Sequence, residues 1–223
     1  NAIAFVSDRT GRQKLWLKEQ ASLLQLTHFD HSSIIQGYAW SPDGKRILAS
    51  VDTRLYRLTL NGIMEQVTLD APVFGVFGWA KNNKVLMQVR EAGELRLALL
   101  ELSSNKYELL AGTNIRWASM DEQGVLVYLD NQSQFWRQDG ASPTLIDALQ
   151  GKSNNGRFIV ANGKIYGVNQ EQSLWSFDLQ TNTYHEIRKL EMQVASISDV
   201  GSQILLTQII SARKDVIELS RSN

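Results

Sequence analysis

The chain has 223 residues, with 23 Lys and Arg against 23 Asp and Glu, three His and no Cys. A formal charge of zero gives no electrostatic reason to expect a nucleic-acid or anionic-membrane surface on this chain. The lack of Cys excludes disulfide scaffolds, cysteine-ligated zinc and a thiol nucleophile. A chain of this length buries roughly 70% of its unfolded surface, so a sizeable core needs neither metal nor disulfide.

The first residues, Asn1–Val6, include neither an initiator Met nor the charged region of a signal peptide. We therefore expect a piece of a longer protein. No apolar run approaches the roughly 18 residues that span a bilayer, so we expect no membrane insertion by this piece.

Short apolar and aromatic segments recur at a nearly constant spacing along the chain. Successive copies begin 40, 40, 40, 39 and 42 residues apart. A drift this small over six copies indicates an internal repeat. The six segments are Leu15–Leu17, Leu55–Leu58, Leu95–Leu97, Phe135–Arg137, Leu174–Phe177 and Val216–Leu219.

Each copy also contains other apolar segments separated by turn residues. A second segment precedes each of those above, as at Ile47–Val51, and an innermost segment precedes the second, as at Tyr38–Trp40 before Ser41-Pro42-Asp43-Gly44. A fourth segment follows, as at Gln66–Leu69. Their lengths, β-branched content and bounding turns predict four strands per unit. The best helical stretch, Asp147–Gln150, is about one turn long.

Four strands at a period of about 40 residues are typical of a β-propeller blade. The prediction is an all-β propeller in one domain spanning 1–223, with six four-stranded blades preferred, the first and last incomplete, and five blades as the alternative. The expected blades are 2–31, 33–70, 72–111, 113–149, 156–190 and 193–223. The first lacks its innermost strand and the last its outermost strand, and we expect preceding residues of the parent protein to supply both.

Two halves of a known repeat can be read in the first two copies. Ile3–Gly11, then Leu15-Trp16-Leu17 and Leu24–Thr27, supply one half, and Trp40–Lys45 supplies the other. Together they resemble the repeat of the TolB-type, WD-like propeller family. The later copies keep the period but lose the signature residues, so the resemblance there is topological.

This resemblance implies three settings: TolB itself, the propellers of prolyl-oligopeptidase-like peptidases, and the extracytoplasmic part of membrane-anchored winged-helix regulators similar to CadC and ToxR. We expect the third: a periplasmic, non-catalytic sensor or interaction domain, with any DNA binding left to an upstream domain. A TolB-like periplasmic adaptor and an accessory propeller gating a serine peptidase remain alternatives. The resemblance carries function only weakly.

The motifs for catalysis, metal or cofactor binding are weak. His28 and His31 lie in a connection between blades, and His185 stands alone on an outer strand, so we expect neither a metal site nor a catalytic triad. Gly151-Lys152-Ser153 lacks the earlier Gly of a phosphate-binding loop, and we expect no cofactor. The tryptophans follow the repeat period, which favours packing between blades over a ligand platform.

The turns between second and third strands open on one face of a propeller, and loops carry function more often than strands do. They hold charged residues of both signs, which suits a protein or peptide partner, although for any single residue an ordinary hydrophilic turn is the preferred explanation. A homodimer is compatible with the sequence. The candidate partner-binding residues are Arg9, Arg12, Arg54, Arg90, Asp130 and Arg213.

Overall fold

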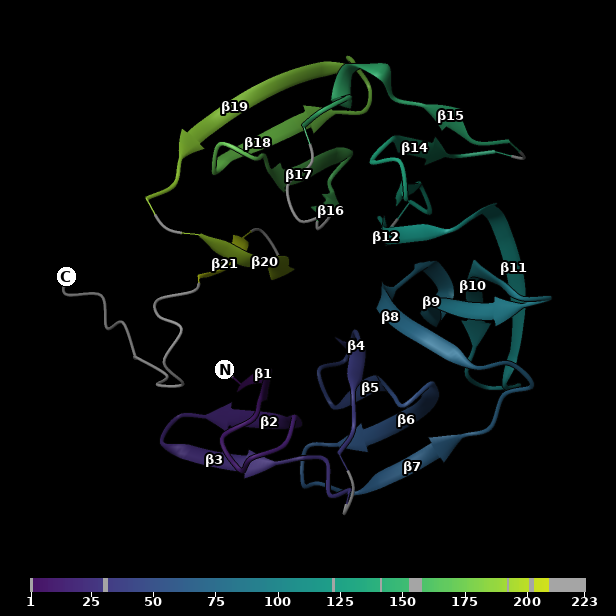
Figure 1. The fold of residues 1–223 in the computed structure, drawn as a ribbon, viewed down its shortest axis with the longest axis vertical. Coiled ribbons are helices and arrows are strands. Elements are labelled where there is room, and N and C mark those ends of the chain that lie inside the picture. Colours follow the sequence, from purple (N-terminus) through teal and green to yellow (C-terminus); the bar gives the residue numbers. More distant parts are fainter. Residues whose placement is uncertain are drawn as a thin grey trace.

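The computed structural model describes residues 2–29, 32–121, 123–140, 142–152, 158–191, 193–200 and 203–208. Within these ranges the chain forms antiparallel sheets that Figure 1 shows arranged like blades around a common axis. Two 3-10 helices, η1 (Lys81–Asn83) and η2 (Asp147–Leu149), interrupt the strands. None of the helices in these ranges is long and apolar enough to cross a membrane.

Four sheets are complete blades whose strands follow chain order from the axis outward. Blade 2 is β4 (Ile35–Trp40), β5 (Arg46–Val51), β6 (Arg54–Thr59) and β7 (Met64–Val67). Blade 3 is β8 (Val73–Trp79), β9 (Lys84–Glu91), β10 (Glu94–Glu101) and β11 (Lys106–Thr113). Blade 4 is β12 (Ile115–Met120), β13 (Leu126–Asp130), β14 (Phe135–Gln138) and β15 (Thr144–Leu145). Blade 5 is β16 (Phe158–Ala161), β17 (Lys164–Val168), β18 (Ser173–Asp178) and β19 (Thr183–Lys189).

The remaining two sheets are smaller. Blade 1 has three strands, β1 (Ala2–Ser7), β2 (Lys14–Glu19) and β3 (Ser22–Gln25), and β20 (Val194–Val200) pairs with β21 (Gln203–Gln208). The predicted β-propeller is therefore confirmed. Within the described residues, five sheets have three or more strands, which matches the alternative of five blades, and the β20–β21 hairpin begins a sixth position around the axis (Figure 1). The third strand expected at Val216–Leu219 lies outside the described residues.

The turn predicted at Ser41-Pro42-Asp43-Gly44 forms through its own side chains. The Ser41 hydroxyl donates to Asp43 Oδ1 at 2.6 Å, and the backbone N–H of Lys45 donates to the same oxygen at 3.1 Å. These bonds, the first above all, lower the pKa of Asp43 below its ordinary value. Gly44 takes a positive φ of 66°, which a residue without Cβ adopts at little cost.

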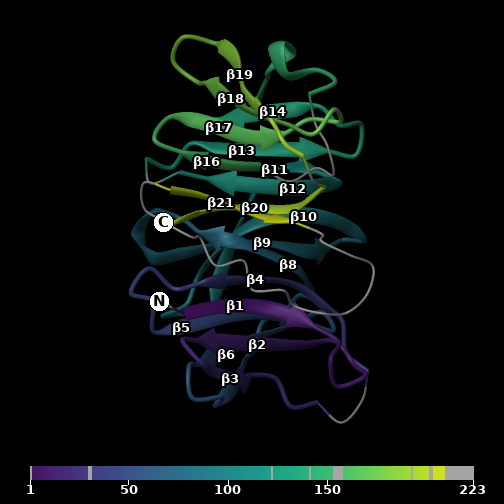
Figure 2. The same cartoon turned by 90° about the vertical axis from the view of Figure 1, so that its left-hand side faces the viewer.

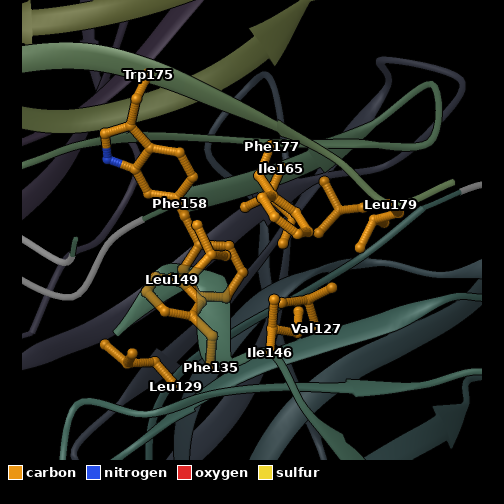
Figure 3. Packing of buried hydrophobic residues seen from close by; sticks show 11 residues of the cluster. Val127, Leu129, Phe135, Ile146, Leu149, Phe158, Ile165, Trp175, Phe177 and Leu179 are labelled. Atoms are coloured by element: carbon orange, nitrogen blue, oxygen red, sulfur yellow. The ribbon is translucent and has the colours of Figure 1, made fainter. Parts of the chain in front are cut away.

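Apolar side chains from neighbouring blades interlock to form the core. Between blades 4 and 5, Phe135 contacts Phe158 with ring centroids 5.1 Å apart and Trp175 edge-on at 5.9 Å. Figure 3 shows these rings packed together with Ile146 and Leu149 from the connection between the blades. The period of aromatic residues in the sequence thus corresponds to packing between blades.

Hydrogen bonds also join each sheet to the next. Ser50 Oγ donates to the carbonyl of Val73 at 2.6 Å, and Gln88, at the equivalent position of the following blade, donates to that of Ile115 at 2.6 Å. The indole of Trp117 donates to the carbonyl of Phe158 at 2.7 Å. The other junctions join Gln13 to Ile35 N, Tyr38 OH to Ala4 O, and Gln172 to Val194 N.

Candidate functional site

The turns between second and third strands gather at one end of the propeller, here called the turn face. They comprise residues 8–13, 52–53, 92–93, 131–134 and 169–172. Because every blade is antiparallel and its strands run from one face to the other, these turns share a face with the connections between blades (Figure 2). The arrangement confirms, for these five turns, the prediction that they open on the same side; the sixth expected turn, Ser211–Asp215, lies outside the described residues.

Each of three inner strands carries a β-bulge one residue after its start. The register shifts lie between Ile35 and Gly37, between Val73 and Gly75, and between Ile115 and Trp117, which leaves Gln36, Phe74 and Arg116 as the extra residues. The inner strand β20 has the same shift between Val194 and Ser196. Bulges re-aim side chains and are common near binding sites.

The three bulge side chains point to the turn face of their own blades. The Gln36 Oε1 atom accepts a hydrogen bond from the Thr53 N–H at 2.9 Å and lies 3.0 Å from the Ser50 hydroxyl oxygen, whose proton is donated to Val73. The Arg90 guanidinium lies 4.4 Å from the centre of the Phe74 ring. Arg116 donates to the Ser133 hydroxyl at 2.9 Å. We call Gln36, Thr53, Phe74, Arg90, Arg116 and Ser133 the inner rim.

Two guanidinium groups of the inner rim are held in place and still face solvent. Arg90 and Arg116 are both exposed. An arginine held by a ring or a hydroxyl loses less side-chain entropy when its remaining donors bind a partner. The inner rim therefore presents oriented hydrogen-bond donors beside the inner strands.

The carboxylate of Asp130 is occupied by its own turn. Its Oδ1 accepts the N–H groups of Gln132 and Gln134, each at 2.9 Å, and its Oδ2 accepts the Trp136 indole N–H at 2.9 Å. Asn169 accepts two equivalent backbone N–H groups in blade 5. The structure thus gives Asp130 a clear role in shaping its turn, and its contact with a partner stays a prediction.

Three other candidate residues, Arg9, Arg12 and Arg54, are placed separately on the turn face. Arg9 folds back on blade 1, where its Nε donates to the Ser7 hydroxyl at 3.2 Å and its guanidinium lies 5.0 Å from the Phe5 and Trp16 rings. Arg12 and Arg54 are exposed, and Arg54 is the first residue of β6. Arg213 lies outside the described residues. Of the candidates, only Arg90 belongs to the inner rim.

Two acidic groups beside these residues bind within the protein. Asp52 Oδ1 accepts the Ile34 N–H at 2.8 Å, and Glu91 Oε2 accepts the Tyr107 hydroxyl at 2.9 Å. Burial, reinforced by this bond to Glu91, raises the pKa of Tyr107 above its ordinary value. Turns of mixed charge are therefore partly fixed by hydrogen bonds within the chain.

The sequence reasoning missed Gln36, Phe74 and Arg116, because a bulge has no fixed residue type. A partial signal is the glycine that follows the extra residue in two inner strands, Gly37 and Gly75. Glycine inside a strand often marks a bulge or a close backbone approach. Arg116 is followed by Trp117, so the signal is lost in blade 4.

The comparisons with known proteins bear on the fold. No family model matches the chain, and no curated protein sequence matches it significantly. Among solved structures, a putative TolB from Agrobacterium tumefaciens matches with a TM-score of 0.69 and 16% identity over 87% of this chain and 76% of that chain. Virginiamycin B lyase from Staphylococcus aureus matches with a TM-score of 0.62 and 15% identity, over 92% and 76%.

Puromycin hydrolase matches with a TM-score of 0.58 and 13% identity, over 87% of this chain but 37% of that chain. Identities this low show a shared fold only. The blades, their strand order and these neighbours together show that the chain is a TolB-like β-propeller in fold.

Proposed function

We propose that the chain is a non-catalytic propeller that binds a protein or peptide partner on its turn face. The observation that carries this proposal is the inner rim, where repeated bulges direct Gln36, Phe74 and Arg116 to one end of the fold and Arg90 and Arg116 stay exposed. The carboxylates of Asp130 and Glu91 are engaged by neighbouring groups of the chain, which favours a role in shaping the site over acid–base catalysis.

We further propose that this propeller is the extracytoplasmic sensor domain of a membrane-anchored transcriptional regulator. The likeness to TolB supports a propeller of this type, and the resemblance of the first two repeats supplies the regulator setting. Fractionating cells that produce the full-length protein tests the setting. We expect the propeller in the periplasm, tethered to the inner membrane; a free periplasmic protein would favour the TolB-like adaptor instead.

The binding proposal is tested by crosslinking in cells. A photo-reactive residue at Gln132, on the turn face, should give a discrete crosslinked partner. The double variant Arg54→Glu/Arg90→Glu should reduce this yield at least about fivefold, because it reverses two exposed charges on the face.

The matched control is Lys45→Glu/Arg46→Glu, which makes the same charge change on two exposed residues, the last of the turn between β4 and β5 and the first of β5, at the opposite end of blade 2. We expect the control to retain crosslinking. Equal loss in both variants, or a crosslink at Lys45 in place of Gln132, would contradict binding at the turn face.

A second candidate function is an accessory propeller attached to a peptidase. The match to puromycin hydrolase favours it, because the chain corresponds to a minor part of that longer protein. This candidate requires a hydrolase domain elsewhere in the same polypeptide. The full gene sequence decides it, since a nucleophile motif of the Gly-x-Ser-x-Gly type would have to follow or precede this chain.

A further inference from the structure

A cleft lies between blades 3 and 4 at the end of the propeller opposite the turn face. It has a volume of about 280 Å³. Its walls come from the turn between β8 and β9, the strands β10 and β11, and two turns of blade 4. The cleft is therefore separate from the inner rim.

The cleft exists because blade 4 has a shorter outer hairpin than blade 3. The strands β14 and β15 have four and two residues, whereas β10 and β11 have eight each. Leu99 on β10 and Leu110 on β11 line the cleft together with Gln138, the last residue of β14.

The floor of the cleft is apolar. Leu99, Leu110 and Met120 are partly buried and pack on a core that includes Leu126, which is 2% exposed. Methionine adapts its shape to what it contacts, and its sulfur makes favourable contacts with aromatic rings. Such a floor suits a flat apolar ring.

The charged groups at the rim already have partners. Lys84 Nζ lies 2.7 Å from Glu108 Oε1, and Asp139 Oδ2 lies 2.7 Å from an Arg137 nitrogen. A charged ligand would have to break one of these pairs or lose its hydration without a new partner. The electrostatics of the cleft therefore favour an uncharged ligand.

We propose that this cleft binds a free, uncharged small molecule built on an aromatic or aliphatic ring. Its volume is near the lower end of small-molecule sites, roughly 300 Å³, and is too small to hold a helix or strand of a partner protein. Asn82 at the edge offers an amide group to a polar atom of the ligand, whereas the Gln138 Nε2 atom already donates to the carbonyl of Gly140.

Indole is a suitable probe, and the titration is followed by amide NMR shifts of the folded protein. We expect saturable shifts at Met120, Gly124 and Gly140, with a dissociation constant of about 1 mM or lower for a ligand of this size. Indole-3-carboxylate, the same ring with a charge, should bind at least about tenfold more weakly. Equal affinity for indole and indole-3-carboxylate would contradict the proposal that the ligand is uncharged.

The variant Leu110→Trp fills the cleft and should weaken indole binding at least about tenfold. Its matched control is Leu109→Trp, on the opposite side of the same strand, where the side chain is 38% exposed. Met120→Gln, which makes the floor polar without adding volume, provides a second test if Leu110→Trp fails to fold.

Three further results would overturn the proposal. They are the absence of saturable shifts in the unmodified protein, saturable shifts confined to other blades, and equal affinity of Leu110→Trp and Leu109→Trp. A Trp-containing tripeptide amide that binds more than about tenfold tighter than indole would identify a protein side chain as the occupant instead. None of these results depends on binding at the turn face.

Discussion

Asp130 shows how one oxygen atom can decide the role of a residue at this site. Both Asp130 and Asn169 hold the turn of their blade by accepting two backbone N–H groups. Only the carboxylate has a second oxygen, which accepts the Trp136 indole. Trp175, at the equivalent position after Asn169, has a buried indole N–H without a partner. The indole N–H of Trp136 in blade 4 thus has a hydrogen-bond partner, whereas that of Trp175 in blade 5 has none among the described residues.

The variant Asp130→Asn tests this reading. Its oxygen can still hold the turn, but its NH2 group would face the Trp136 N–H, so we expect the free energy of unfolding to fall by about 1–2 kcal/mol. Urea unfolding measures the change, and Asp147→Asn, at an exposed residue, is the control. A loss of partner crosslinking with unchanged stability would show instead that Asp130 acts mainly in binding.

At the scale of elements, the inner strands are packed backbone to backbone. A Cβ added at Gly37 on β4 would lie 2.7 Å from the carbonyl oxygen of Val76 and 2.8 Å from its nitrogen, both on β8. Backbone atoms cannot rotate away as a side chain can. Glycine at this position therefore allows blades 2 and 3 to approach each other.

We expect Gly37→Ala to lower the free energy of unfolding by about 1–3 kcal/mol, because the methyl group forces the two strands apart. The control is Gly78→Ala, also on an inner strand, where an added Cβ meets no atom within 4 Å. That change should stay within about 0.5 kcal/mol. Equal effects of the two variants, measured by thermal and urea unfolding, would disprove the close approach.

The bulges are also features of elements. They place one side chain of an inner strand against the turn of the same blade, and this contact connects the inner rim to the turn face. A pattern of alternating apolar and polar residues cannot reveal a bulge. A bulge is defined by the pairing of two strands, because one residue on the bulged strand has no partner on the other.

For the whole molecule, stability depends on each blade being joined to the next. The Gln88 side chain is 7% exposed and donates to the carbonyl of Ile115 in the following blade. A buried carbonyl without a donor carries its full desolvation cost. Loss of the hydrogen bond between Gln88 and Ile115 should therefore lower the free energy of unfolding of the whole propeller.

The variant Gln88→Leu removes the donor while keeping a similar volume, and we expect a loss of about 1–3 kcal/mol in unfolding free energy. Gln66→Leu, at an exposed position on β7, is the control and should change stability little. Circular dichroism and tryptophan fluorescence should give the same transition. Two separate transitions would show that the blades unfold independently.

Much of the fold could be predicted from the sequence by itself. The strands, their order and the blade follow from three features: the period of about 40 residues, the four apolar segments of each copy, and turns such as Ser41–Gly44. Each of these features can be read from the order of residues along the chain, because it depends on local propensity or on repeat spacing. The same reasoning placed Arg54, Arg90 and Asp130 at the ends of strands on one face.

Only the tertiary structure decided how those residues act. Asp130 accepts the Trp136 indole N–H, the Arg90 guanidinium lies over the Phe74 ring, and the cleft lies where the outer strands of blade 4 are shorter than those of blade 3. Each of these features depends on pairing register or on contact between segments far apart in the sequence. Hydrogen bonds and packing across blades are set by three-dimensional distance, which a one-dimensional pattern does not contain.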